Sequence, residues 1–300
     1  MDSMDRRDFL KAAAAAVAAA AWRPRRLFAE EAAPVARVVV VKGTDLPRMM
    51  EAGIQKVGGW PAFVAAGNNV TLKVNAGWAS TPEQGANTQP AMVEHCIRAC
   101  LAAGAAAVAL PENPCSPSAK SFEMSGIGAA AKRAGGRLYE PDDEKDFVET
   151  EIPRGRVLRQ AAIARDVLEA DCLINMPVAK SHNGATLTLG LKNWMGAVRD
   201  RGFWHRNGLH QCIADFSTRI RAHLTIVDAT RIMVTNGPRG PGRLETPNEI
   251  LFGTDPVAVD ACAATLFQKA PFDIPHIRIA HEAGLGCGDL AQVAVERIEA

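Results

Sequence analysis

Apolar runs rich in β-branched residues alternate along the chain with longer segments whose apolar residues recur at helical spacing. The apolar runs predict strands over residues 36–43, 69–77, 105–113, 171–178, 223–230 and 249–255. The intervening segments predict helices over residues 46–57, 89–104, 118–134, 159–170, 209–222 and 256–268. The region 137–160 is more polar, so we expect a solvent-exposed loop around EPDDEKD.

Strands that alternate with helices predict βαβ units and a mostly parallel sheet. Because the strands are apolar almost throughout, we expect helices on both faces of that sheet. The length of 300 residues suits one large domain or two joined lobes. No internal repeat, linker or change of composition divides the chain. The sequence therefore predicts a single α/β domain, and a bilobal arrangement stays open.

The first 29 residues resemble a twin-arginine export signal. Arg6-Arg7 is followed by DFLK, an apolar run over 12–22 and small residues near Ala29 that suit cleavage. The run is too short and too weakly hydrophobic to form a stable membrane span. The resemblance implies a signal peptide over 1–29, a mature domain over 30–300 and passage through the twin-arginine export machinery, which moves folded proteins. We expect a periplasmic or otherwise exported protein without a membrane span after cleavage.

Composition argues against nucleic acid as a partner. The net charge is +1, so the chain as a whole has no basic field to attract a phosphate backbone. Aromatic residues make up 5% of the chain with a single Tyr, which disfavours stacking platforms for bases.

The seven cysteines contain no Cys-x-x-Cys pair and no ferredoxin-type cassette. Cys115 and Cys287 are the two that fall in loops with a setting suited to metal ligands. We keep an iron-sulfur cluster or a divalent metal as a possible cofactor on these two residues. Acidic side chains such as Glu112 and Asp228 are further candidates for a divalent cation.

Polar side chains gather where the predicted strands end. The residues concerned are Lys73, Asn75, Glu112, Asn113, Asn175, Lys180, His182, Asp228 and Asp255. Ligands of open parallel sheets bind outside the carboxyl ends of the strands, because these ends share one edge. We therefore expect residues far apart in the sequence to meet at a single site.

Several stretches, in this order, are similar to the family called domain of unknown function 362. They are KVN at 73–75, NMPVAKSH at 175–182, LKNWMG at 191–196, NGPRG at 236–240 and GTDPVAVD at 253–260. The resemblance runs from about residue 36 to the C-terminus and implies an α/β fold. Many relatives carry twin-arginine leaders, and others end in a ferredoxin-like module with two iron-sulfur clusters, which this sequence lacks.

Lys73, Lys180 and Lys192 suggest what the site binds. A lysine in or beside an apolar strand reaches solvent or meets an anion, because an isolated buried ammonium is costly. Three of them at one edge predict a site for phosphate, carboxylate or an anionic cofactor. The alternative is that each lysine pairs with a structural carboxylate such as Asp228, Asp255 or Asp260.

The candidate residues divide by role. Lys180, His182 and Lys192 are the candidates for catalysis, with His182 as an acid/base group, a metal ligand or a structural hydrogen-bonding group. His205 and His210 lie in a polar segment that either closes over the site or is simply exposed. Candidates for ligand binding are Lys73, Asn75, Glu112, Asn113, Asn183, Asn193, Asp228, Asn236, Arg239, Asp255 and Asp260.

Three functional hypotheses follow. The first is an exported α/β protein that binds an anionic small molecule or cofactor at the carboxyl edge of the sheet, and whether it is an enzyme stays open. The second is a metal or iron-sulfur redox protein without the ferredoxin module, and the third is a non-catalytic oxyanion-binding protein. The loop NGPRGPGR matches neither the dinucleotide fingerprint nor the phosphate loop, so we do not predict NAD or ATP.

Overall fold

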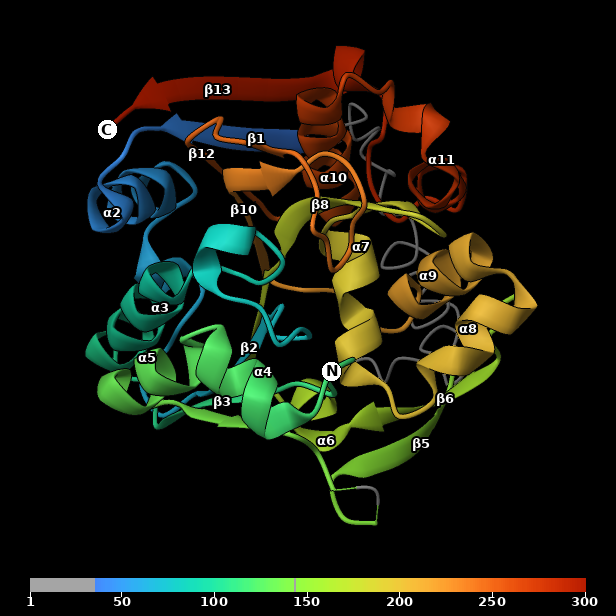
Figure 1. The fold of residues 1–300 in the computed structure, drawn as a ribbon, viewed down its shortest axis with the longest axis horizontal. Coiled ribbons are helices and arrows are strands. Elements are labelled where there is room, and N and C mark those ends of the chain that lie inside the picture. The colour runs from blue at the N-terminus through green and yellow to red at the C-terminus, as the bar shows by residue number, and fades with distance from the viewer. Residues whose placement is uncertain (1–35, 143) are drawn as a thin grey trace, which may run out of the picture. The chain divides into compact units, whose positions relative to one another are not determined.

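The computed structural model describes residues 36–300 apart from residue 143, so the expected signal peptide lies outside the described residues. A central sheet runs through the domain in the order β13-β1-β12-β10-β7-β2-β3-β4 (Figure 1). Its strands are β1 (Ala36–Lys42), β2 (Asn69–Val74), β3 (Ala107–Pro111), β4 (Arg137–Tyr139), β7 (Cys172–Met176), β10 (Leu224–Met233), β12 (Glu249–Gly253) and β13 (Val293–Glu299). The short strand β11 (Leu244–Glu245) pairs with β10.

The sheet is mostly parallel, which confirms the predicted fold class. The strands β10, β7, β2, β3 and β4 pair in parallel, and so do β1 and β13. β12 is antiparallel to both of its neighbours, β1 and β10. Because Gly253 of β12 pairs with Thr225 near the start of β10, β12 ends at the edge opposite to the carboxyl ends of the parallel strands.

Helices cover both faces of the sheet, as the apolar strands predict. Val39 and Val41 of β1 face a layer that contains α2 (Leu46–Lys56), α3 (Pro90–Ala102) and α5 (Ile127–Ala134). Val38 and Val40 face the other layer, which contains α7 (Gly190–Asn193), α9 (Leu209–Ser217), α10 (Pro256–Ala264) and α11 (Pro275–Glu282) (Figure 1).

The first of these two layers contains a group of thiols. Cys96 and Cys100 of α3 and Cys172 of β7 are fully buried in it, and all seven cysteines are free. Burial, and to a smaller extent the neighbouring Cys100 thiol, raise the pKa of Cys172 to about 12. All three side chains act as small apolar residues in the core.

Two of the predicted helices are wrong in part. Residues 159–170 form strand β6 (Gln160–Ala164) and only one turn of helix, α6 (Arg165–Leu168). β6 pairs with β5 (Phe147–Glu151) as a separate two-stranded sheet, which the sequence did not predict. The described residues of the EPDDEKD segment lie outside helices and strands, as expected. The helix predicted over 118–134 is divided into α4 (Ser118–Met124) and α5 by Gly126, whose φ of 71° belongs to the left-handed region.

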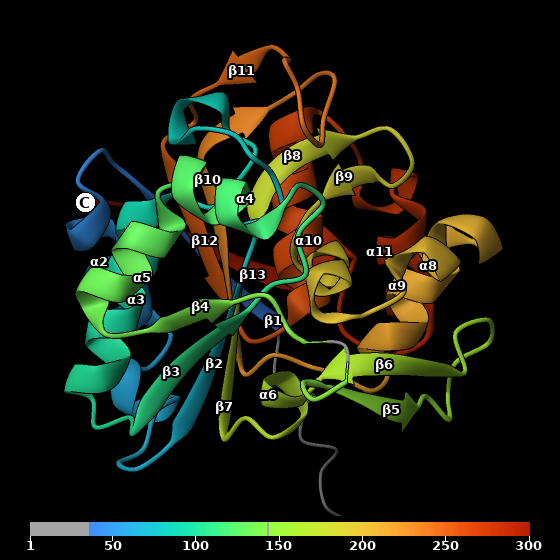
Figure 2. The same ribbon diagram turned by 60° about the horizontal axis from the view of Figure 1, so that its bottom comes forward.

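The stretch 175–196 crosses the carboxyl edge of the sheet. β7 is followed at once by β8 (Val178–His182), which pairs with β10 and then with β9 (Thr186–Thr188) in a hairpin (Figure 2). α7 follows, then a 3-10 turn (Trp194–Ala197) and α8 (Arg201–Asn207). None of the helices in the described part of the chain is long and apolar enough to cross a membrane.

Candidate functional site

A pocket of about 440 Å³ opens at the carboxyl ends of β2 and β3. Its walls come from these strand ends, from the β8–β9 hairpin, from α7 with the turn after it, and from α8. Residues that the sequence singled out and that line it are Asn75, Glu112, Asn113, Cys115, Lys180, His182, Lys192, Asn193 and His205.

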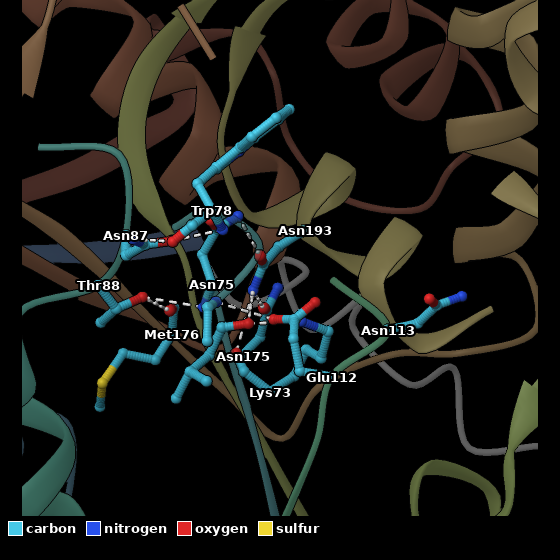
Figure 3. Close-up of polar contacts among 12 residues, drawn as sticks. Lys73, Asn75, Trp78, Asn87, Thr88, Glu112, Asn113, Asn175, Met176 and Asn193 are labelled. Carbon is cyan, nitrogen blue, oxygen red and sulfur yellow. Dashed lines mark hydrogen bonds and ion pairs between the residues drawn. The ribbon is translucent and has the colours of Figure 1, made fainter. Parts of the chain in front are cut away.

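Three asparagine amides tie the elements of the pocket together. The Asn193 Nδ2 atom donates to Asn175 Oδ1 at 2.8 Å and to the Lys73 carbonyl at 3.0 Å. Asn75 Nδ2 donates to Asn193 Oδ1 at 3.0 Å, and Asn175 Nδ2 donates to the Gly190 carbonyl at 2.8 Å. Figure 3 shows this network between β2, β7 and α7. Asn193 and Asn175 thus hold α7 against β2 and β7, and Asn75 and Asn193 also line the pocket.

Lys73 is fully buried and does not line the pocket. Its Nζ atom lies 2.8 Å from Glu112 Oε2, and the same oxygen accepts the Ala76 N–H at 2.9 Å (Figure 3). For Lys73, the alternative of pairing with a structural carboxylate is therefore correct. The partner is Glu112 and not one of the aspartates named above. Gly196 packs directly on the pair, because a Cβ atom there would lie 1.9 Å from Glu112 Oε1.

Lys180 extends from β8 into the floor of the pocket. Its Nζ atom donates to Asn75 Oδ1 at 3.1 Å and to the Ala86 carbonyl. Both acceptors are neutral, so no described residue gives the ammonium a direct counter-charge. Burial, with a smaller contribution from the neighbouring Lys192 charge, lowers the pKa of Lys180 to about 7.

Lys192 is the second cation of the floor, and its residue is 8% exposed. Burial and the nearby Arg201 lower its pKa to about 8, burial being the larger cause, while Cys115 opposes the shift. Within the described part of the chain, no ion pair joins Lys192 to a carboxylate. Its charge therefore points at the pocket without a protein partner.

His182 has a fixed tautomer. Its Nδ1 atom accepts the backbone N–H groups of Gly184 and Ala185, both at 3.0 Å, so the ring proton sits on Nε2. Burial lowers the pKa of His182 to about 3, and the nearby Lys192 and His205 contribute to this shift. His205 stacks on it with ring centroids 6.1 Å apart. At neutral pH His182 is thus a hydrogen-bond donor from Nε2 and has no free ring nitrogen to act as a base.

α8 forms a wall of the pocket where the sequence suggested a polar loop. Asp200 caps it by accepting the Phe203 N–H at 3.0 Å. Arg201 lines the pocket and donates to the carbonyls of Asn113 and Pro114, which fixes the helix to the loop after β3. Trp204 is buried and packs on Phe216 with centroids 5.3 Å apart.

Sequence reasoning missed several lining residues. Arg201, Trp78, Thr188, Met195 and Pro238 all belong to the wall of the pocket. The start of α8 could have been predicted from Asp200, because aspartate is a common N-cap residue and Asp200 caps this helix. Thr188 gave no signal, because its position in a strand looks like that of any core threonine.

Three predicted aspartates do not reach the pocket, because each binds backbone N–H groups elsewhere. Asp228 accepts the Gln89 and Thr230 N–H groups, and burial raises its pKa. Asp255 caps α10 through the Val257 and Ala258 N–H groups, at the opposite edge of the sheet, because β12 is antiparallel. Asp260 accepts backbone N–H groups at the start of α7.

Asp260 fixes the start of α7 and does not pair with a lysine. Its two carboxylate oxygens accept the N–H groups of Gly190 at 2.7 Å and of Leu191 at 2.9 Å. Burial raises the pKa of Asp260 to about 7. Through these two bonds it holds the helix that carries Lys192.

The other loop candidates also lie outside the pocket lining. Asn183 is exposed at the turn between β8 and β9. Asn236 is exposed and donates to the Pro241 carbonyl at 3.3 Å, and Arg239 is exposed in the same loop. That loop reaches the pocket through Pro238 instead.

The two cysteine candidates cannot share a metal ion. Cys115 is exposed and lines the pocket, whereas the Cys287 N–H donates to Asp255 Oδ2 at the opposite edge of the sheet. Over residues 36–300 without 143, no three or more His, Cys, Asp or Glu side chains gather as a metal-binding group. The donor set of the described residues does not fit an iron-sulfur cluster on Cys115 and Cys287.

The fold and the N-terminal signal define the protein as an exported α/β protein. The signature of the TAT (twin-arginine translocation) pathway signal sequence matches residues 3–21, which indicates export by that pathway. The profile of the Domain of unknown function (DUF362) matches residues 70–265. The chain belongs to this family.

Two known proteins are similar to the chain. The thylakoid-associated protein sll1697 of Synechocystis sp. is 24% identical over 249 residues, which cover 77% of this chain and 73% of that protein. The lactate racemase apoprotein from Thermoanaerobacterium thermosaccharolyticum superposes with a TM-score of 0.44 and 10% identity, over 70% of this chain and 54% of that chain. The chain thus matches about half the length of that enzyme.

Proposed function

We propose that this exported protein binds a small anionic molecule in the pocket at the carboxyl edge of its sheet. The observation that carries the proposal is Lys192, a buried ammonium that faces the pocket without a carboxylate partner in the described part of the chain. The anion would supply the missing counter-charge.

The balance of charge in the pocket supports this assignment. Lys180, Lys192 and Arg201 line it, and the acidic residue in the lining is Glu112. Glu112 forms its ion pair with Lys73, and its charge only partly opposes the lowering of the Lys180 pKa by burial. Burying cations without compensation costs free energy, and a bound anion recovers part of that cost. The lowered pKa values of Lys180 and Lys192 reflect the same unfavourable charge.

The pocket also supports an enzyme that transfers protons, with Lys180 as the proton-transferring group. A pKa of about 7 allows Lys180 to exchange a proton near neutral pH. His182, the other candidate, already uses Nδ1 to accept two backbone N–H groups. In such an enzyme Lys192 would bind the anion and His182 would orient it.

Thermal unfolding in the presence of anions tests the binding proposal. Acetate and inorganic phosphate are expected to raise the Tm of the exported protein with increasing concentration, because a ligand that binds only the folded state stabilises it. The shift should vanish in Lys192→Met and persist in Lys132→Met, a control on the exposed face of α5. Equal shifts in both variants, or no shift with any carboxylate or phosphate, would contradict the proposal.

A further inference from the structure

We infer that the ligand is an organic carboxylate with an aromatic or branched apolar body, and not an inorganic oxyanion. The inference rests on the proposed anion site and adds to it the shape and chemistry of the remaining walls. The carboxylate would face Lys192, Thr188 and His182, and the apolar body would lie against Trp78, Met195 and Pro238.

The size of the pocket favours an organic ligand. A volume of about 440 Å³ lies in the range of sites for small organic molecules, about 300–1,000 Å³, whose walls are mainly apolar with a few placed polar groups. A phosphate or sulfate ion would fill only a small part of it. Such an ion also has no apolar surface to bury against an indole or a thioether.

Trp78 is presented on a rigid turn. The Asn87 side chain accepts the Trp78 N–H at 3.1 Å and donates to the Trp78 carbonyl at 2.9 Å, and Asn87 is itself 2% exposed. In Figure 3 the Trp78 side chain extends away from the asparagine network. The backbone of Trp78 is fixed, and its partly exposed indole lines the pocket. A ligand can therefore bury apolar surface against the indole at little cost in conformational entropy.

Two other apolar residues of the lining are also fixed in place. The Gly237 N–H donates to Ser181 Oγ at 3.0 Å, and a Cβ atom on Gly237 would lie 1.9 Å from the Ser181 carbonyl oxygen. This close approach holds Pro238 beside β8. Met195 is 6% exposed and lies three residues after Lys192, so the cation and an apolar wall come from one short segment.

The polar end of the pocket suits a carboxylate. Thr188 is 2% exposed, and its Oγ1 atom has no hydrogen-bond partner among the described residues. A buried hydroxyl without a partner is costly, and a ligand oxygen would satisfy it. His182 provides a second donor through Nε2–H, since Nδ1 is occupied. Two neutral donors and the Lys192 ammonium match the two oxygens of one carboxylate.

Calorimetric titration with a matched set of compounds tests the inference. The set is phenylacetate, its neutral analogue phenylacetamide, acetate and inorganic phosphate. Phenylacetate is expected to bind at least about tenfold more tightly than acetate or phosphate, since it alone combines the charge with an apolar body. Phenylacetamide should bind at least about tenfold more weakly than phenylacetate, because it lacks the charge.

Two variants separate this inference from the proposed function. Trp78→Ala should weaken phenylacetate binding by about tenfold and leave acetate binding unchanged, and Trp78→Phe should restore phenylacetate binding. Acetate or phosphate binding as tight as that of phenylacetate, or equal losses for acetate and phenylacetate in Trp78→Ala, would overturn the inference and leave the anion site intact. Absence of binding by every anion would overturn both.

Discussion

The carboxylate of Glu112, which lines the pocket, lies 2.8 Å from the buried ammonium of Lys73. The two side chains come from neighbouring strand ends, β3 and β2, and both are at least 96% buried. Because the Ala76 N–H binds the same carboxylate oxygen, Glu112 is held toward Lys73. The pair is neutral as a unit. Among the described residues, no ion pair joins Lys180, Lys192 or Arg201 to an acid.

The substitution Glu112→Gln is expected to destabilise the protein strongly. It leaves the Lys73 ammonium buried without a counter-charge, and removing one partner of such a pair typically costs about 3–5 kcal/mol. Urea unfolding at neutral pH measures the loss. Glu123→Gln on the exposed surface of α4 is the control and should change stability by less than about 0.5 kcal/mol. A loss of similar, small size in both variants would show that the pair does not bear on stability.

Lys192→Met is expected to make the ligand-free protein more stable at pH values below about 8. It keeps the apolar stem and removes a charge whose pKa falls from 10.5 to about 8 on folding. The shift corresponds to at most about 3 kcal/mol, and urea unfolding should show a gain of that order or smaller. A lower stability of Lys192→Met would mean that the charge is compensated.

The pH dependence of stability gives an independent check on the same residue. A lysine with a lowered folded-state pKa binds fewer protons in the folded state than in the unfolded state, so stability rises with pH between the two pKa values. For Lys192 that window runs from about 8 to 10.5. The rise over this window should be smaller in Lys192→Met than in the wild type, as followed by Tm against pH. Identical curves for the two proteins would contradict the lowered pKa.

His182 is expected to stay neutral between about pH 5 and 9, because its pKa of about 3 lies below this range. ¹⁵N-detected NMR should show a non-protonated Nδ1 and a protonated Nε2 over the whole range. The exposed His205 serves as an internal reference, because burial lowers the pKa of His205 by less than that of His182. A His182 resonance that titrates near pH 6 would require the two backbone N–H bonds to Nδ1 to be absent.

Binding of an anion should take up protons between about pH 7 and 9. The free protein has Lys180 and Lys192 with pKa values of about 7 and 8, and a bound negative charge raises both. Affinity should therefore fall as pH rises through this range. Calorimetry of phenylacetate binding in buffers of different ionisation enthalpy measures the protons taken up. A binding enthalpy that does not depend on the buffer would show that neither lysine changes its protonation.

The sequence predicted the parallel part of the sheet and its helical layers well, because strand and helix patterns are local. It placed Asn75, Lys180 and Glu112 at strand ends, and β2, β3 and β8 bring them to one pocket. It placed Asp255 at the same edge, which is wrong, because the direction of β12 depends on pairing with β1 and β10 and not on its own residues.

Other differences also have long-range causes. The segment 159–170 contains good helix formers, yet residues 160–164 form a strand because β5 pairs with them along five residue positions. The partner of Lys73 could not be read from the sequence, since Glu112 lies 39 positions away and the pairing depends on the neighbouring order of β2 and β3. The tautomer of His182 depends on a hairpin turn whose N–H groups carry no sequence signature.

The buried thiols of Cys96, Cys100 and Cys172 bear on the choice of export route. An unfolded chain that entered an oxidising compartment would expose these sulfurs before its core formed, and they could then be joined to the wrong partners. A chain that crosses the membrane already folded presents only the exposed Cys115 and the partly exposed Cys287 to the oxidants outside. For this protein, folding before passage therefore protects its own interior from chemical damage.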